Sequence, residues 1–267
     1  ITERGLGNGV SLIIFSGIVA ELPRALAQIL EQGRTGAISP ILIIIIFVLA
    51  IAVIAFIVFI ERSQRKIIVQ YPKRQVGNKI FSGDSSHLPL KINVPGVIPP
   101  IFASALLLLP TSVSSFAGIG SESPEWLITL NSLLGRGQPI YLAIYIGLIV
   151  FFAFFYTAIV FNPDETADNL KRNGGFVPGI RPGPPTADYL DFVLTRLTAI
   201  GALYLSAVCI LPEILISKYS IPFYFGGTSL LIVVTVAIDT VTQAQSHMIA
   251  HQYSGLIKKR RLGGYSR

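Results

Sequence analysis

The sequence predicts an all-α polytopic membrane protein with six transmembrane helices and two long polar loops. Hydrophobic residues make up 52% of the 267 residues and charged residues only 13%, and the mean hydropathy is +0.65, on the apolar side of an ordinary soluble domain. Because a bilayer span needs roughly 20 apolar residues, five or six spans fit this length in a single membrane domain. The single cysteine, Cys209, lies in an apolar stretch, which excludes a disulfide framework.

The six expected spans cover residues of about 10–32, 40–60, 94–114, 138–161, 191–212 and 226–246. Glu21 and Pro23 interrupt the first span and make it amphipathic, so we expect it to line a wet surface. The second span carries no charge and is the plainest transmembrane helix. The third holds four prolines and is expected to be kinked, since proline removes a helical hydrogen bond; they are Pro95, Pro99, Pro100 and Pro110.

Three polar or aromatic features need interpretation beside these spans. Residues 124–134 include Trp126 and are too short to span, which predicts an interfacial helix. Asp239 in the last span costs on the order of 2.5 to 3.5 kcal/mol at a bilayer centre, so it must face protein or water. Because no intramembrane cation accompanies it, we favour a structural hydrogen-bonding role over proton coupling. His247 and His251 are interpreted as an interfacial pair, since no third metal ligand lies nearby in the sequence.

The first long loop, residues 61–93, is polar and basic. Short runs of β-branched and aliphatic residues near 67–69 and 90–92 predict two paired strands that leave the membrane. The tip of this hairpin would carry Lys73, Arg74 and Lys79.

The second long loop, residues 162–190, is expected to begin with a short helix. Asn162 is placed to cap it, Pro163 suits its first position, and two acidic residues follow in the first turn. A glycine pair should end this helix, and two Pro-Gly turns then present Arg181 at a stiff loop tip. Thr186 is predicted to cap the next helix.

The distribution of cations predicts the orientation. With a cytoplasmic N-terminus, six spans place both chain ends, both long loops and the tail 247–267 in the cytoplasm. The opposite side then holds only four of the 21 lysines and arginines: Arg24, Arg34, Arg136 and Lys218. The positive-inside rule therefore fixes this topology. Such a basic face suits anionic lipid or an acidic or nucleic-acid-containing partner.

Catalytic groups are not apparent in the sequence. No nucleophile, general base and oxyanion donors, and no paired catalytic carboxylates, can be placed within one layer of the membrane domain. We therefore expect neither an enzyme nor a bound cofactor.

The chain closely resembles the SecY family, the channel subunits of the bacterial Sec translocon, in six segments: ERSQRKIIVQYPKRQ, HLPLKIN, GVIPPIFAS, FNPDETADNLKRNGGFVPGIRPG, TRLT and PFYFGGTSLLIVV. Their order and spacing match that family along the whole chain. The resemblance implies that these are helices five to ten, the C-terminal part of a ten-helix, two-halved channel whose first four helices are absent from this sequence.

The resemblance also assigns roles to individual residues. It implies a hydrophobic pore ring formed by Val10, Ile14, Ile101 and Ile232. It implies docking of a ribosome or motor on the two long loops through Arg65, Lys66, Lys73, Arg74 and Arg181. The proline-rich span 94–114 would form one side of a lateral gate, with the gate residues Ile98, Pro99, Ile101 and Phe102.

A protein of this family is expected to pass unfolded preproteins across the bacterial cytoplasmic (inner) membrane and to release membrane segments sideways. The partners that the resemblance implies are the SecE and SecG subunits, the SecA motor, the ribosome with its RNA, signal peptides and preproteins, and membrane lipids. The alternative is a secondary transporter of a small solute, which broken helices and Asp239 would suit. A transporter predicts polar groups at the midplane, where this sequence places aliphatic residues.

Overall fold

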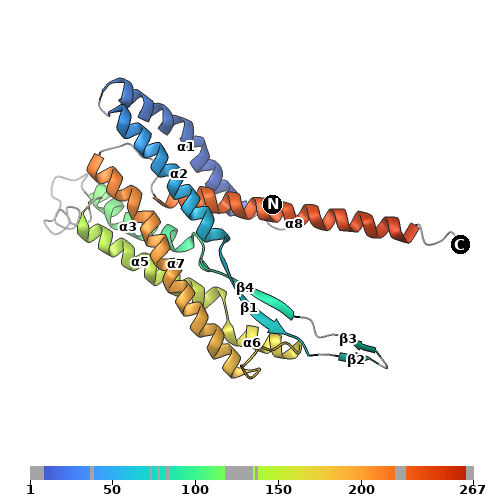
Figure 1. Ribbon diagram of the computed structural model, residues 1–267. Coiled ribbons are helices and arrows are strands. Elements are labelled where there is room, and N and C mark those ends of the chain that lie inside the picture. The colour runs from blue at the N-terminus through green and yellow to red at the C-terminus, as the bar shows by residue number, and fades with distance from the viewer. Residues whose placement is uncertain are drawn as a thin grey trace.

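A computed structural model of the chain (Figure 1) describes residues 9–36, 39–72, 74–76, 79–81, 85–117, 135, 138–219 and 227–262. Its elements are, in order, α1 (Gly9–Arg34), α2 (Pro40–Arg62), β1 (Gln64–Gln70), β2 (Arg74–Val76), β3 (Lys79–Phe81), β4 (Ser85–Lys91), α3 (Ile98–Ala117), α5 (Pro139–Val160), α6 (Pro163–Arg172), α7 (Pro184–Tyr219) and α8 (Gly227–Leu262). The interfacial helix predicted around Trp126 lies outside the described residues.

The helices form a largely apolar bundle. Five of them are long and apolar enough to cross a membrane, namely α1, α2, α5 with α6, α7 and α8, and α3 contributes a shorter apolar helix over Ile98–Pro110. Large hydrophobic side chains such as Ile41, Ile44 and Ile51 on α2 are more than 60% exposed. An apolar face of this kind is stable in lipid rather than in water. The polytopic helical class predicted from composition is thus confirmed.

The main hydrophobic core lies between α3, α5 and α7, with α2 and α8 packed against it. Ile57, Ile149, Leu205, Cys209 and Leu231 are fully buried in this cluster. Cys209 is therefore a small, free core residue. In Figure 1, α3, α5 and α7 lie side by side, and α1 and α2 form an antiparallel pair next to them.

Three of the four prolines predicted to kink the third span lie before α3 or in its first turn, and the kink itself stays a prediction. Pro99 and Pro100 lie in the first turn of α3, where a proline costs no helical hydrogen bond, and Pro95 precedes the helix. All three are fully buried. Only Pro110 lies inside α3. The proline-rich segment is therefore mainly a rigid, buried entry to the helix.

Two helices extend beyond their predicted spans. The first turn of α7 begins at Pro184, and the Gly183 carbonyl accepts from the Thr186 and Ala187 amides. The prediction that Thr186 caps this helix is therefore wrong: its hydroxyl donates instead to the Arg181 carbonyl at 2.8 Å. The 36 residues of α8 give a helix of roughly 54 Å, so it outreaches a hydrocarbon core of about 30 Å.

Candidate docking surface and channel residues

The first loop forms a two-stranded antiparallel ladder outside the bundle. β1 pairs with β4 from Gln64↔Lys91 to Gln70↔Ser85, and the short strands β2 and β3 continue the hairpin. Ile67 and Val69 are buried under this ladder, while Arg65 and Lys66 are exposed. One face of the hairpin is therefore buried beyond Lys66, and its cations are exposed to solvent.

The second loop begins with α6, as its sequence predicts. The Asn162 side chain accepts from the Asp164 and Glu165 amides at 3.1 and 3.4 Å, and Pro163 is the first helical residue. α6 ends at Arg172, and Gly174 follows with a φ of 73°. A left-handed residue after the last turn favours glycine, which explains this helix end.

The two loops are joined to each other. The Gln70 amide donates to the Phe176 carbonyl at 2.9 Å, and the Phe176 amide donates back to the Gln70 carbonyl at 2.9 Å. A Cβ on Gly175 would lie 3.0 Å from side-chain atoms of both Val69 and Tyr71, so the close approach favours glycine. The sequence gives no sign of this bridge, because backbone groups of two distant loops form it.

A buried cluster stabilises the junction. Ile67 and Leu90 of the hairpin pack with Val177 of the second loop and with Leu190 and Leu194 of α7. We call β1, β4, α6 and residues 173–183 together the loop platform. In Figure 1, the hairpin and α6 lie at the same end of the bundle. The platform is thus one packed unit in which the two loops share a hydrophobic core.

Arg181 stands at the tip of this platform. It is exposed, while its neighbour Ile180 packs against the buried cluster. The flanking Gly179 and Gly183 have φ values of 84° and 115°, and the Ile180 amide donates to the Val177 carbonyl at 3.1 Å. With the Thr186 hydroxyl on its carbonyl, the backbone of Arg181 is held in place and its guanidinium faces solvent.

The remaining docking candidates lie along the hairpin. Arg65 and Lys66 belong to the exposed part of β1 beside the membrane end of the ladder. Arg74 begins β2, of which only the backbone is described. Lys73 lies outside the described residues. Docking by these four residues stays a prediction.

The pore-ring candidates lie on three different helices. Val10 and Ile14 are on α1, Ile101 is on α3 and Ile232 is on α8. α1 packs against α8, whereas α3 packs chiefly against α5. Ile232 is 7% exposed and Ile14 is 39% exposed. Within the described residues, no hydrophobic cluster unites these side chains, so their convergence on one constriction stays a prediction.

The gate candidates lie in the first turns of α3. Ile98 begins the helix, and Pro99 is buried beneath it. Phe102 is 54% exposed and stacks on Phe152 of α5, with ring centroids 5.7 Å apart. α3 is therefore anchored on α5 while part of its surface stays open.

An apolar cavity of about 220 Å³ opens between α1, α2 and α8. Its lining includes Leu22, Ile29, Ile46, Ile54, Leu230 and Val233. Every side chain that lines it is apolar, so it offers a small polar solute no hydrogen-bonding group.

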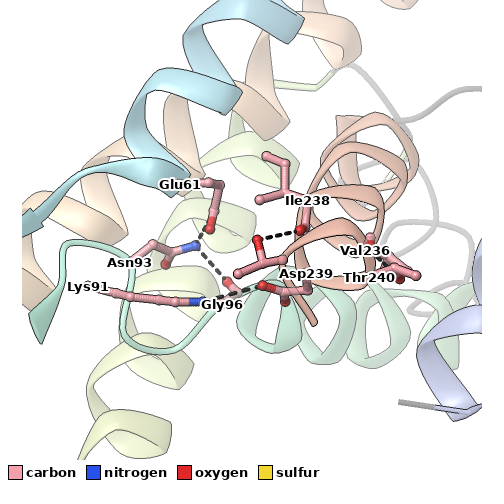
Figure 2. Close-up of polar contacts among 9 residues, drawn as sticks. Glu61, Lys91, Asn93, Gly96, Val236, Ile238, Asp239 and Thr240 are labelled. Carbon is pink, nitrogen blue, oxygen red and sulfur yellow. Dashed lines mark hydrogen bonds and ion pairs between the residues drawn. The ribbon is translucent and has the colours of Figure 1, made fainter. Parts of the chain in front are cut away.

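A polar cluster lies where the hairpin meets the helices (Figure 2). The Lys91 ammonium, at the end of β4, pairs with the Asp239 carboxylate of α8 at 3.3 Å. The cation that accompanies Asp239 therefore comes from the hairpin loop and not from a membrane span, which the sequence did not indicate. These residues are 148 positions apart, and only the fold brings them together. No local spacing in the sequence could have indicated the pair.

Glu61 and Asn93 form the buried part of this cluster. The Asn93 amide nitrogen donates to the Glu61 carboxylate at 2.6 Å and to the Gly96 carbonyl at 3.2 Å. The Tyr204 hydroxyl of α7 donates to the same carboxylate at 3.5 Å. Glu61 and Asn93 are 7% and 2% exposed. A buried carboxylate with two donors ties the end of α2 to the segment that leads into α3.

Fold and site together define a multi-pass helical membrane protein with a packed polar platform at one end of its bundle. The SecY family model matches residues 1–241, and the chain belongs to the SecY family. It is 53% identical to the protein translocase subunit SecY of Rickettsia typhi over 98% of this chain and 60% of that protein. For the SecY of Vibrio cholerae, the identity is 54% over 100% of this chain and 61% of the relative.

The chain thus spans about 60% of the length of the curated relatives it matches. Two solved structures share its fold at 18% sequence identity. One is a SecY structure from work on how the plug domain stabilises the closed state of the translocation channel. Its TM-score is 0.63, and the match covers 93% of this chain and 62% of that chain. The other is the structure of a protein-conducting channel, with a TM-score of 0.59 over 93% and 61%.

Proposed function

We propose that the protein containing this chain is the central subunit of a protein-conducting channel. It would pass unfolded preproteins across the bacterial cytoplasmic membrane and release membrane segments through a lateral gate. The observation that carries this proposal is the joining of two polar loops into one platform at the end of an apolar bundle, in a chain of the SecY family. The platform supplies a docking surface, and the bundle supplies the path.

The docking role follows from how Arg181 is held. Its side chain is exposed, and its backbone is fixed by two turns and by the Thr186 hydroxyl. Little ordering entropy is left for this residue to lose when a partner binds. Arg65, Lys66, Lys73 and Arg74 add positive charge along the hairpin. Such a surface suits the SecA motor or the RNA of a ribosome.

The constriction is assigned to Val10, Ile14, Ile101 and Ile232. A ring of branched aliphatic side chains sheds water and limits ion leak, and it offers an unfolded chain no polar partner to bind. The packing of α1 beside α8 supports this assignment, because it places two of the three ring-bearing helices next to each other.

The lateral gate is assigned to α3, with Ile98, Pro99, Ile101 and Phe102 along its first turns. The buried proline entry holds one end of this helix, and the half-exposed Phe102 leaves a surface for a passing segment. An apolar segment that leaves sideways gains about 25 cal/mol for each Å² removed from water. Signal peptides and lipids are therefore ligands of this side of the channel.

The chain lies in the membrane with both of its ends in the cytoplasm, and it assembles with SecE and SecG. The concentration of lysine and arginine on the two long loops and the tail supports this orientation. Energy comes from a docked partner. The rival function, secondary transport of a small solute, lacks support: the cavity beside α8 has an apolar lining, and Asp239 is occupied by Lys91.

Site-specific crosslinking tests the channel path. Single cysteines at Ile14, Ile101 and Ile232 are introduced into the full-length protein, assembled with its partner subunits, with the buried Cys209 replaced by alanine. A precursor stalled during motor-driven transport should crosslink to all three positions. The control is a cysteine at Ile44 on α2, which is 63% exposed on the outer surface of the bundle.

Two results would contradict the proposal. Equal crosslinking at Ile44 and at the ring positions would show that the precursor does not follow the predicted path. A complete channel that fails to transport any precursor with SecA and ATP would refute the function itself.

A further inference from the structure

The short segment between β4 and α3 is held from two directions. Asn93 is bound to Glu61 at the end of α2, and Gly201 of α7 packs so closely that a Cβ there would lie 3.1 Å from the Ile92 carbonyl. Pro95 is fully buried, and Gly96 has a φ of 65°. The segment is therefore a fixed connection between the loop platform and α3, and it starts at Lys91.

Lys91 points from this segment to α8, as Figure 2 shows. Asp239 is the only acidic residue in the sequence of α8. It lies seven residues after Ile232, and two helical turns place both on the same face, roughly 10 Å apart along the axis. Lys91 precedes Ile101 by ten positions. The ion pair thus connects β4, which leads into α3 and Ile101, to α8, which carries Ile232.

The ion pair between Lys91 and Asp239 is exposed to water and easy to break. The Lys91 and Asp239 side chains are 51% and 50% exposed, so water screens them and the pair is weak. The neighbouring Glu61–Asn93 bond is buried and therefore much harder to break. Any movement of the platform against α8 would separate the exposed pair first, while the buried bond keeps the segment on α2.

We propose that Lys91 and Asp239 are positioning residues that clamp α8 to the base of the hairpin and thereby hold the channel closed. This inference rests on the proposed function. A partner that docks on the loop platform moves β4 and its terminal Lys91 relative to α8. Loss of the ion pair then lets the two ring-bearing helices separate. Lys91 and Asp239 act by setting the position of α8 and do not contact the transported chain.

The test measures ion leak through the resting channel. Full-length protein with its partner subunits is placed in planar bilayers without motor or precursor. Lys91→Gln and Asp239→Asn should each raise the leak on the order of two- to fivefold, the range expected for an exposed ion pair. The double variant should leak no more than either single variant. The exchange Lys91→Asp with Asp239→Lys should bring the leak back toward the original level.

Two controls separate the clamp from general effects. Asp191→Asn removes an exposed acidic charge on α7 and should leave the leak unchanged. Lys91→Arg with Asp239→Glu keeps both charges, and it also serves if the neutral variants do not accumulate in the membrane. Raised leak in this charge-conserving pair would show that side-chain shape, not the ion pair, sets closure, and would overturn the proposal.

The remaining outcomes distinguish the two proposals. If both single neutral variants leak no more than the original channel, or if their effects multiply in the double variant, the clamp is wrong. The proposed function stands in that case as long as the original channel still transports precursor. If the original channel transports none, the proposed function itself fails.

Discussion

Arg181→Glu is the substitution that most directly tests the docking surface. Because the side chain is exposed and its backbone is held by the Thr186 hydroxyl, the change should alter the free energy of unfolding by less than about 0.5 kcal/mol. A hydrogen bond to a charged group contributes roughly 1.5 to 3 kcal/mol. Losing one such hydrogen bond between the Arg181 guanidinium and the motor should weaken binding of the motor on the order of ten- to a hundredfold.

The assay is ATP-driven transport of a secreted precursor into inverted membrane vesicles that carry the full-length variant. Transport should fall sharply, while abundance of the subunit and its assembly with partners stay near normal. Arg172→Glu is the matched control, because it reverses an exposed charge at the end of α6, away from the loop tip. It should have a much smaller effect.

A second substitution separates the charge of Arg181 from the rigidity of its backbone. Thr186→Val removes the hydroxyl that donates to the Arg181 carbonyl but keeps the guanidinium. Motor affinity should fall less than in Arg181→Glu, because only ordering of the loop is lost. Transport at the original rate in Arg181→Glu, or failure of that variant to accumulate in the membrane, would refute the docking role.

Two other predictions concern the hairpin tip and the loop junction. Reversing both Lys73 and Arg74 to glutamate should weaken ribosome or motor binding, most strongly at low salt, because screening reduces the contribution of exposed charges; affinity equal to that of the original channel at every salt concentration would contradict it. Gly175→Ala places a Cβ 3.0 Å from side-chain atoms of Val69 and Tyr71 and should destabilise the loop junction by about 1 to 3 kcal/mol. Limited proteolysis of the loops measures this, and Gly147→Ala on α5, which has open space, is the control that should stay intact.

Local sequence signals predicted the parts of the fold that depend on neighbouring residues. Asn162 and Pro163 fix the start of α6 because capping and proline geometry operate within one turn. The β-branched run at 67–69 predicted the hairpin for the same reason. The Pro-Gly dipeptides on both sides of Arg181 predicted the turns at this loop tip, because turn conformation depends on adjacent residues.

Features that depend on distant residues could not be predicted in this way. Asp239 lies in a largely apolar stretch of the sequence, and its partner Lys91 belongs to a hairpin 148 residues away. The bridge between Gln70 and Phe176 uses backbone groups, which carry no side-chain signal. Sequence alone did not separate the roles of the prolines near α3: Pro95, Pro99 and Pro100 lie before the helix or in its first turn, where no helical hydrogen bond is lost, and Pro110 lies in its interior.

The path from the docking surface to the membrane helices follows from these long-range contacts. Ile180, beside Arg181, packs against the cluster that contains Leu90, and Leu90 directly precedes Lys91. A load on the loop tip therefore reaches the clamp through packed side chains and one strand. An exposed ion pair contributes roughly 0 to 1 kcal/mol, and docking through one charged hydrogen bond supplies roughly 1.5 to 3 kcal/mol. Even a small differential interaction of a partner with the two states is therefore enough to favour the released clamp.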